Sequence, residues 1–377
     1  MGQVHARSYL QVPLRFPDLN VQPRLVICSD NVAERATTTQ STLGFETSTT
    51  DWQQVIEHPD VQIINIATPN NLHLDIVKAA AAAGKHIMCE KPVGRNPSET
   101  AQIEALSRAA GVLTFVGFNY RWVPLVQHLS KLIHEKRLGD LTHFRGRFFS
   151  MYGSNPYGLM SWRFDKKIAG LGAMGDIMAH TADMALFIAG PIKRVSSTSH
   201  TFITERPLPI PGKGTHYSVG KPGDPTGHVT NEDYVGALVE FENGARGTLE
   251  VSRTIFGPKN QFAFEVNGTR GAANWDFERM NELQLYLPSD DGLHDGFVRL
   301  VGGDQYPYHG HFNPGEGSGI DYDDLHVIEA YEFLKSVVNE TQSTPGFAEI
   351  LEVAKVHDAM IRSWSSGTWE DVHDLSI

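Results

Sequence analysis

Short apolar runs alternate with helical patterns over the first 120 residues, and this alternation constrains the fold more than any other feature of the chain. The apolar runs cover residues 24–29, 61–67, 86–89 and 112–118. Strands that alternate with helices across short links form parallel sheets with helices on both faces. The first third of the chain is therefore predicted to be an α/β domain spanning residues 1–120.

After Tyr120 the pattern changes to apolar runs joined by turns. Runs at 234–241 and 246–253 flank Asn243-Gly244, and a second pair at 261–266 and 271–277 flanks a turn that contains Asn267-Gly268. Because Asn-Gly between alternating runs is a strong hairpin signal, an antiparallel sheet is expected within residues 121–377. The Pro- and Gly-rich stretch 205–230 is predicted to be a long irregular loop. Helices are predicted at 124–135, 323–339 and 347–364.

Composition excludes several classes of protein. A length of 377 residues suits two domains, and the net charge of −12 argues against nucleic-acid binding. No apolar run reaches the ~20 residues that span a bilayer, and no secretory signal is visible. Cys28 and Cys89 are expected to be buried thiols, which is typical of a cytoplasmic protein.

The N-terminus holds part of a dinucleotide-binding pattern. Such domains open with a strand and Gly-x-Gly-x-x-Gly, and Gly2 takes the place of the third glycine. We therefore expect the native chain to begin about 10–20 residues upstream of Met1. Asp30 follows the run 24–29, where a carboxylate accepts ribose hydroxyls and repels a ribose phosphate, favouring NAD over NADP. The alternative role of Asp30 is a helix N-cap.

Polar residues also follow the next two strands. In ATPNNLH (67–73), Thr68 and Asn70 are placed to hydrogen-bond a dinucleotide, with His73 one helical turn later; turn and capping chemistry is the alternative. In the sequence Glu90-Lys91-Pro92, the proline ends a strand and holds Lys91 at its carboxyl end. A lysine partly removed from water is suited to proton transfer or hydrogen-bond donation.

Asp176 and His180 are separated by four residues in AGLGAMGDIMAHTADM (169–184), a spacing that places both on one helix face. Histidine accepts a hydroxyl proton near neutral pH, and a neighbouring carboxylate can orient it or bind an adjacent hydroxyl. A third ligand at metal spacing is missing, so we expect no metal site.

These motifs together resemble the glucose–fructose oxidoreductase, inositol dehydrogenase and rhizopine-catabolism family (Gfo/Idh/MocA). The resemblance rests on ATPNNLHLDIVKAAAAAGKHIMCEKP, on VGFNYRWVP and on the glycine-rich run before Asp176 and His180. SWRFDKKIAG, ITERP and PYHGHFNPGEGSGIDYDD are similar to a subgroup that includes levoglucosan dehydrogenase. The resemblance implies a Rossmann domain, here lacking its first strand, followed by an α+β domain with a large, mostly antiparallel sheet.

The resemblance also implies roles for individual residues. Lys91 and His180 are the expected catalytic residues, and Asp176 is their partner, which contacts the sugar. The NAD site is expected to include Asn119 together with Thr68, Asn70, His73, Glu90 and Lys91. Trp162 and Arg163 resemble a pair that approaches the cofactor in related reductases. The expected substrate residues are Tyr120, Arg121, Tyr152 and Asp176.

The resulting prediction is an NAD-dependent dehydrogenase that oxidises a hydroxyl of a sugar, anhydrosugar or polyol. Family members are commonly dimers or tetramers, and a homo-oligomer is expected here. Two alternatives remain open: a non-catalytic NAD-binding sensor, and a glycoside hydrolase that uses tightly held NAD transiently.

Overall fold

Parallel strands make up the sheet structure of the N-terminal part, as predicted, but they form two separate sheets. The computed structural model describes residues 1–210, 217–289, 292–293 and 295–375. β1 (Ile27–Ser29) pairs with β2 (Thr47–Thr49), whereas β3 (Ile63–Ile66), β4 (His86–Cys89) and β5 (Thr114–Val116) form the second sheet in that order. The helices of this part are α1 (Gly2–Arg15), α2 (Ala33–Leu43), α3 (Trp52–Glu57), α4 (His73–Ala82) and α5 (Pro97–Ala110).

Local capping explains where these helices begin and end. The Asn96 side chain accepts a hydrogen bond from the Glu99 backbone N–H, and Pro97 occupies the first helical position of α5. The helix ends at Gly111, whose φ of 67° lies in the left-handed region. Helix α3 begins after Asp51, which accepts from the Gln53 backbone N–H. Each of these boundaries agrees with a signal in the sequence.

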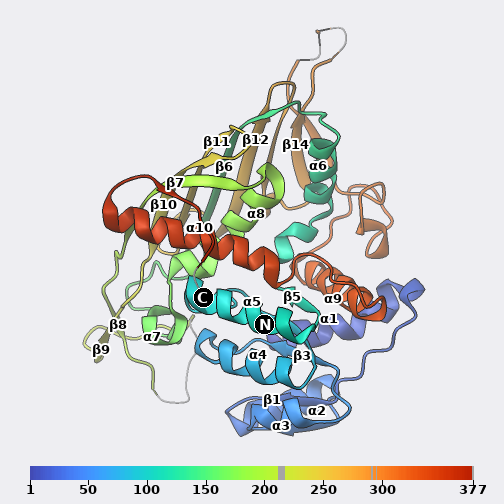
Figure 1. Ribbon diagram of the computed structural model, residues 1–377, viewed down its shortest axis with the longest axis vertical. Helices are drawn as coiled ribbons and strands as arrows, with labels where there is room; N and C mark the ends of the chain where they lie inside the picture. The colour runs from blue at the N-terminus through green and yellow to red at the C-terminus, as the bar shows by residue number, and fades with distance from the viewer. Residues whose placement is uncertain (211–216, 290–291, 294, 376–377) are drawn as a thin grey trace.

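A loop from the end of the chain closes the free edge of β5. The Thr114 backbone N–H donates to Gln342 Oε1 (2.9 Å), and the Val116 N–H donates to the Pro345 carbonyl (3.0 Å). This loop joins α9 (Tyr322–Val338) to α10 (Phe347–Ser366), and these two helices pack against α1 and α5 respectively (Figure 1). The last helices of the chain therefore lie on the N-terminal part and join it to the rest of the protein.

The second part is built on a nine-stranded sheet in the order β15-β14-β13-β12-β6-β11-β10-β7-β16. Its strands are β6 (Leu141–Ser150), β7 (Ile192–His200), β10 (Tyr234–Phe241), β11 (Arg246–Ser252), β12 (Asn260–Gly268), β13 (Ala272–Asp276), β14 (Glu282–Tyr286), β15 (Val298–Val301) and β16 (Glu370–Asp371). Both predicted hairpins, β10–β11 and β12–β13, are antiparallel. The sheet is therefore mostly antiparallel, and the pairing of β6 with β11 is parallel.

The predicted irregular loop at 205–230 needs correction. It contains β8 (Glu205–Pro207) and β9 (Thr226–His228), which pair antiparallel as a separate ribbon. Residues 211–216 of the predicted loop lie outside the described part of the chain. Alternation over three residues between prolines and glycines is too short to stand out as strand in the sequence.

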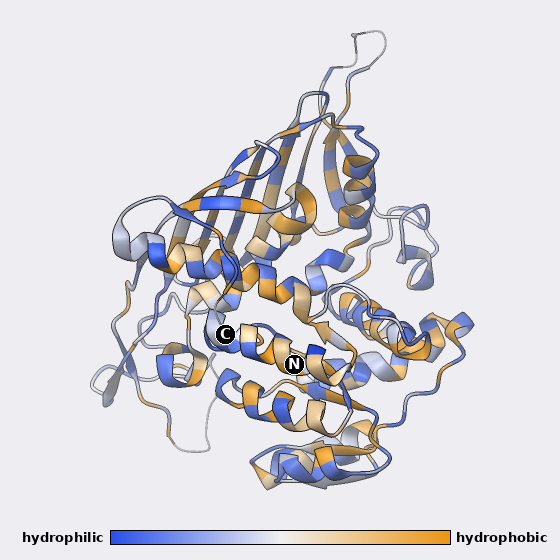
Figure 2. Cartoon of the chain, in the orientation of Figure 1, coloured by the Kyte–Doolittle hydropathy of each residue, from blue (hydrophilic) through white to orange (hydrophobic). Residues whose placement is uncertain are grey.

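Helices cover one face of the nine-stranded sheet. Helix α8 (Ala179–Ala189) packs on β6 and β11, α10 packs on β7, and α6 (Pro124–His134) contacts β14 (Figure 1). On the covered face, the rings of Phe148 and Phe262 stack with centroids 5.1 Å apart. Apolar and polar residues alternate along the strands, as Figure 2 shows. This alternation gives the sheet one core face, which carries α8 and the residues at its start.

Candidate active site

The Lys91 side chain connects the two parts of the protein at Asp176. Lys91 follows β4, and its Nζ donates to Asp176 Oδ1 (3.0 Å) and to the Asp176 carbonyl oxygen (2.6 Å). The Lys91 side chain is 15 % exposed and that of Asp176 is 27 % exposed, so a small molecule can reach the pair. The two most specific motifs of the sequence, far apart along the chain, therefore meet directly.

Asp176 lies in an irregular helical turn. Residues Met174–Met178 form a π-helical turn that leads directly into α8. Such turns are rare and are frequent at functional sites, because they change the direction of side chains relative to a regular helix. Thus Asp176 and His180 are not simply one turn apart on a continuous α-helix, as the spacing predicted.

Glu232 holds the start of this turn. Its carboxylate accepts hydrogen bonds from the backbone N–H groups of Gly172 (2.7 Å) and Met174 (2.9 Å). A carboxylate is well placed at a helix N-terminus, where unpaired N–H groups point outward. Sequence reasoning missed Glu232, since it lies more than fifty residues after the turn that it caps and no local signal links the two.

The glycine-rich run before Asp176 lies in close contact with two backbone segments, at Arg95 and at Glu232. A side chain at Gly170, whose φ is 75°, would collide with the carbonyl oxygen of Arg95, and one at Gly172 would collide with that of Glu232. The Leu171 N–H donates to the Arg95 carbonyl (3.2 Å). The glycines therefore allow the Asp176 turn to approach the Lys91 loop closely.

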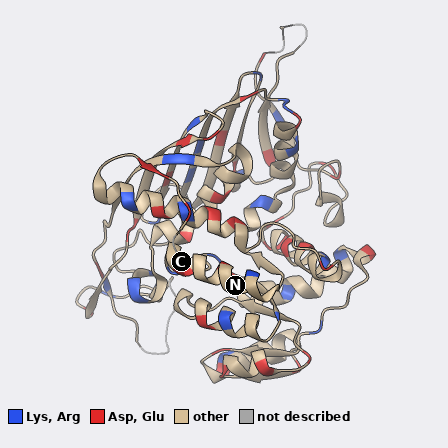
Figure 3. Ribbon diagram, in the orientation of Figure 1, with Lys and Arg blue, Asp and Glu red and all other residues tan. Residues whose placement is uncertain are grey.

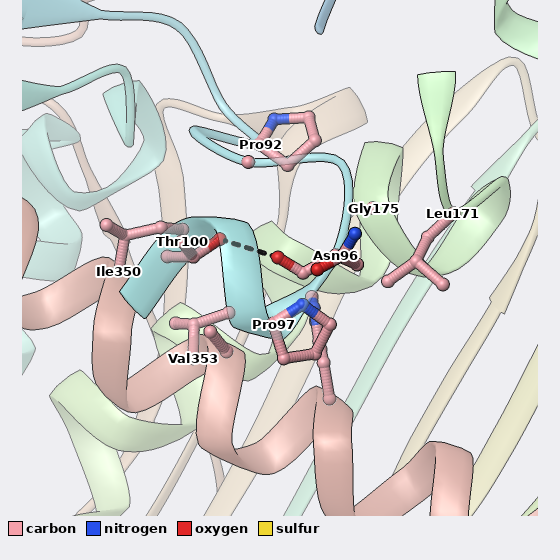
Figure 4. A pocket seen from close by; sticks show the side chains of 11 residues that line it. Pro92, Asn96, Pro97, Thr100, Leu171, Gly175, Ile350 and Val353 are labelled. Atoms are coloured by element: carbon pink, nitrogen blue, oxygen red, sulfur yellow. Dashed lines mark hydrogen bonds between the residues drawn. The ribbon is translucent and has the colours of Figure 1, made fainter. Parts of the chain in front are cut away.

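A small pocket lies behind Pro92 (Figure 4). Pro92 faces Gly175, where a Cβ would be 3.4 Å from the proline Cγ, and Ile350 and Val353 of α10 form the opposite wall. Thr100 closes the start of α5 by donating to the Asn96 carbonyl (3.2 Å). The lining therefore joins the loop after Lys91, the turn before Asp176 and α10.

The His180 imidazole lies in an aromatic enclosure. It is 6 % exposed, and its ring centroid is 4.7 Å from that of Tyr120, 5.8 Å from Phe118 and 6.0 Å from Phe148. Burial and the nearby charge of Lys91 hold the pKa of His180 well below its ordinary value. His180 is therefore neutral near pH 7 and available as a proton acceptor.

The Asp176 carboxylate is kept ionised. Burial alone would raise its pKa, but the charges of Lys91 and Arg163 and the hydrogen bond from Tyr152 outweigh burial and lower it. The Tyr152 hydroxyl donates to Asp176 Oδ2 (2.8 Å). Tyr152, predicted from the family resemblance to contact substrate, is thus part of the same cluster.

Trp162 and Arg163 are held by a buried charge pair. The Arg163 guanidinium lies 4.5 Å from the Trp162 ring centroid, and the Arg163 carbonyl accepts from Arg253 Nη1 (3.2 Å). The side chains of Arg253 and Asp233 are fully buried, with Nε donating to Oδ1 over 2.8 Å. Sequence reasoning missed this pair, because neither residue lies in a recognisable motif. It fixes the segment that carries Arg163 within electrostatic range of Asp176.

Two of the predicted NAD-lining residues have buried polar atoms without a hydrogen-bond partner. Thr68 Oγ1 and Asn119 Nδ2 are both of this kind among the described residues. They follow β3 and β5, on either side of Lys91 at the end of β4. Because buried polar groups in folded proteins are normally hydrogen-bonded, a ligand that bonds to these two atoms fits this edge of the sheet.

The turn after β3 also contacts the second part of the chain. Asn70 is 5 % exposed and donates from Nδ2 to the Ala169 carbonyl (2.8 Å). The predicted cofactor contact of Asn70 therefore competes with a hydrogen bond that already joins the two parts. Gly2 lies against this turn, and a Cβ at Gly2 would be in ordinary contact with Ala67 at 3.7 Å.

Three predicted site residues have other partners. His73 is 1 % exposed, with Nδ1 3.1 Å from the Pro92 carbonyl oxygen and Nε2 3.0 Å from that of Thr68, so it braces the two turns from behind. The Glu90 carboxylate faces His5, with Oε1 2.9 Å from Nε2. Arg121 binds Asp183 through two hydrogen bonds of 2.8 and 2.6 Å. The expected cofactor roles of His73 and Glu90 and the expected substrate role of Arg121 stay predictions beside these contacts.

Asp30 forms a turn before α2 but is not the N-cap that its sequence position allowed, because Val32 is the N-cap residue of this helix. Its Oδ1 accepts from the backbone N–H of Val32, the residue before α2 (2.9 Å). This bond uses one of the two carboxylate oxygens, and the side chain is partly exposed at the end of β1. Because the turn uses Oδ1 alone, Asp30 Oδ2 can still accept a hydrogen bond from a ribose hydroxyl.

Comparison with known proteins agrees with this geometry. Residues 1–118 match "Oxidoreductase family, NAD-binding Rossmann fold", and residues 126–274 match "GFO/IDH/MocA C-terminal domain". Levoglucosan dehydrogenase of Pseudarthrobacter phenanthrenivorans is 36 % identical over 376 residues, which cover 100 % of this chain and 96 % of that protein. The chain belongs to the Gfo/Idh/MocA oxidoreductase family.

Solved structures of this family support the same assignment. A levoglucosan dehydrogenase in complex with NADH superposes with a TM-score of 0.93 at 35 % identity, covering 100 % of this chain and 97 % of that one. The complex of levoglucosan dehydrogenase with NADH and levoglucosan gives 0.92 at 35 % identity, with coverage of 99 % and 96 %. The predicted family and the predicted combination of a Rossmann domain with a mostly antiparallel domain are confirmed.

Two further properties concern the described residues alone. Within them, no group of three or more His, Cys, Asp or Glu side chains is arranged to hold a metal ion. None of their helices combines the length and the apolar character needed to cross a membrane.

Proposed function

We propose that this Gfo/Idh/MocA protein oxidises a secondary hydroxyl of a sugar, anhydrosugar or polyol, with NAD as the hydride acceptor. The observation that carries the proposal is the meeting of Lys91 and Asp176 at the start of the helix that bears His180. The Lys91–Asp176 pair is partly accessible, and both of its charges act on the buried His180 imidazole. The similarity to levoglucosan dehydrogenase supports an anhydrosugar or a related polyol as substrate.

Each residue has a distinct role in this proposal. Thr68 and Asn119 would hydrogen-bond NAD at the ends of β3 and β5, and the bound nicotinamide would supply the hydride acceptor for the hydroxyl-bearing carbon. The neutral His180 imidazole takes the hydroxyl proton, and the Lys91 ammonium stabilises the negative charge that develops on the oxygen. Asp176 orients Lys91 and accepts a hydrogen bond from a neighbouring substrate hydroxyl.

Asp30 supports NAD over NADP. Its partly exposed carboxylate at the end of β1 leaves one oxygen to accept from the ribose hydroxyls, and its negative charge repels a ribose phosphate. A comparison of the two cofactors at equal concentration tests this choice.

The experiment that tests the function is a substrate screen with the purified protein. Levoglucosan, myo-inositol and D-glucose are incubated with NAD or NADP, and the absorbance of the reduced nicotinamide is followed. The proposal predicts NAD reduction together with an equal amount of oxidised sugar. Binding of a sugar without turnover would instead indicate a sensor, and release of free sugar from a glycoside without net NAD reduction would indicate a hydrolase.

We also propose that the uncovered face of the nine-stranded sheet forms a homodimer or homotetramer interface. Arg145 and Arg147 on β6 pair there with Glu265 on β12. Figure 3 shows blue and red segments along the strands of the sheet. Interspersed charges of opposite sign suit a symmetric contact between two copies. Light scattering after size-exclusion chromatography gives the mass directly, and a mass of 41.7 kDa, that of one chain, would contradict the proposal.

A further inference from the structure

A buried cluster of two histidines and two glutamates lies on the side of Lys91 away from the reacting groups. His5 on α1 faces Glu90, and His326 on α9 contacts Glu329 with Nδ1 2.6 Å from Oε2. The two imidazole rings are 5.5 Å apart between centroids. All four residues are buried, with at most 9 % of their surface exposed. The expected catalytic mechanism uses none of these contacts.

Glu90 connects this cluster to Lys91 through the backbone. Its Oε2 accepts from the Lys91 backbone N–H (3.3 Å), while Oε1 faces His5 Nε2 at 2.9 Å. Gly117 at the end of β5 lies against the same carboxylate, where an added Cβ would be 3.2 Å from both Cδ and Oε2. The carboxylate is thus enclosed by α1, by the end of β5 and by its own strand, which leaves it one orientation.

The orientation of the His5 ring is fixed by a contact with Asn65. His5 Nδ1 contacts the Asn65 side chain on β3, with Oδ1 at 3.1 Å and Nδ2 at 3.0 Å. A small cavity separates this pair from α9 and is lined by His5, Tyr9, Asn65, Met88, His326, Glu329 and Ala330. On its α9 side, His326 Nε2 and Glu329 Oε1 have no hydrogen-bond partner among the described residues.

The charges of the four groups differ. Burial would raise the pKa of Glu90, but the adjacent His5 imidazole and the charge of Lys91 outweigh it and lower the pKa to about 2. Burial raises the pKa of Glu329 well above its ordinary value and lowers that of His326 to about 4. Burial therefore favours the neutral forms of the α9 pair, whereas the surroundings of Glu90 favour its ionised form.

We propose that Glu90, oriented by His5, is a positioning residue that fixes the Lys91 backbone and places a permanent negative charge behind the Lys91–Asp176–His180 site. This inference rests on the proposed function. The charge acts on His180 across the site, because Glu90 counteracts the effects of burial and of Lys91 on that imidazole. The titratable groups that interact with Glu90 or His180 come from every surrounding element: His5 on α1, His73 on α4, Cys89 and Lys91 at the end of β4, Tyr120 after β5, Asp176 before α8, and Tyr322, His326 and Glu329 on α9.

Glu90→Gln separates the hydrogen bond to the Lys91 backbone from the negative charge of the carboxylate. The amide retains an oxygen that can accept from the Lys91 N–H, but it removes the charge. Without that charge, the pKa of His180 falls further, so the midpoint of the His180 titration moves to lower pH by roughly half a pH unit. Protein with isotope-labelled histidine gives this midpoint by NMR without cofactor or substrate, and His180→Gln identifies the signal. In the enzyme assay, the acid limb of the kcat/KM profile moves in the same direction.

Glu104→Gln is the matched control. Glu104 is a buried carboxylate (8 % exposed) on α5 that pairs with Arg108, and it contacts none of the site residues. This variant is expected to leave the His180 midpoint unchanged. His5→Gln provides a second test in case Glu90→Gln does not fold, and it is expected to shift the midpoint in the same direction by a smaller amount.

An unchanged His180 midpoint in folded Glu90→Gln or His5→Gln would overturn the proposal, as would equal shifts in Glu90→Gln and Glu104→Gln. Because the NMR titration needs no turnover, it distinguishes this inference from the proposed function. If the wild-type protein oxidises no sugar but the midpoint moves as expected, the electrostatic coupling stands and the dehydrogenase assignment fails.

Discussion

Lys91 binds Asp176 twice, through the side-chain carboxylate at 3.0 Å and through the backbone carbonyl at 2.6 Å. The second bond uses a carbonyl in the π-helical turn Met174–Met178. The position of the ammonium group is therefore set by the irregular backbone as well as by a charge pair. Changes that disturb this turn should affect the reaction even where they touch neither Lys91 nor His180.

Gly170→Ala tests the close approach of the two backbones. The new methyl group would meet the Arg95 carbonyl oxygen, so we expect a loss of stability clearly greater than the cost of a positive φ, which is about 1 kcal/mol. Thermal unfolding measures the difference. Gly223→Ala is the control, because Gly223 also has a positive φ (89°) but no atom within 4 Å of the built Cβ. Equal losses in the two variants would contradict the packing argument.

Asp233→Ala tests the buried pair behind Arg163. It leaves the fully buried Arg253 guanidinium without its carboxylate, which is expected to lower the free energy of unfolding by about 3–5 kcal/mol. Urea unfolding measures this value. Asp140→Ala removes one partner of the exposed Lys136–Asp140 pair and should change stability by about 0.5 kcal/mol or less. A small effect of Asp233→Ala would show that the pair does not anchor this segment.

Glu329→Gln should change the dependence of stability on pH. The pKa of Glu329 is raised in the folded protein, so its contribution is complete below its unfolded pKa of about 4.5 and is lost as pH rises toward the folded pKa. Glutamine cannot ionise, so the variant should gain stability relative to wild type as pH rises from 5 to 8, by up to about 1.4 kcal/mol per pH unit.

Melting temperatures of the two proteins at pH 4.5 and pH 8 measure this gain. Glu352→Gln, an exposed substitution on α10, serves as the control and should show no such trend. A Glu329→Gln variant that is equally destabilised at both pH values would mean that the wild-type carboxyl group is ionised in the folded protein.

Asp30→Ser is expected to reduce the preference for NAD. Serine can still accept from the Val32 N–H, so the turn before α2 is preserved, but the charge that repels a ribose phosphate is removed. The ratio of kcat/KM for NAD to that for NADP should fall by about tenfold or more, which corresponds to about 1.4 kcal/mol. An unchanged ratio would restrict Asp30 to its role in the turn before α2.

The sequence predicted most local elements because their boundaries depend on neighbouring residues. Asn96, Pro97 and Gly111 define α5 by capping chemistry alone, and Asn243-Gly244 places the turn between β10 and β11. The same reasoning located Lys91, Asp176 and His180, since the motif of each is contiguous.

Partners that are distant in the sequence could not be predicted in this way. The first three residues of β6 are not buried, so no apolar run marks where the strand begins. Even so, β6 pairs with both β11 and β12 at the centre of the sheet. The contact of Glu90 with His5 on a different helix is another example, since no local pattern links the two residues. The split of the parallel strands into two sheets likewise depends on tertiary pairing that no local pattern reports.

The most direct test of the account is the turnover of Lys91→Ala and His180→Ala with the best substrate from the sugar screen. If His180 accepts the proton and Lys91 stabilises the oxygen, each variant should lose about 10²–10⁴-fold in kcat while its unfolding transition remains cooperative. Lys131→Ala, which removes an exposed lysine on α6, should retain the wild-type rate. Near-wild-type turnover in both site variants would contradict the proposed chemistry.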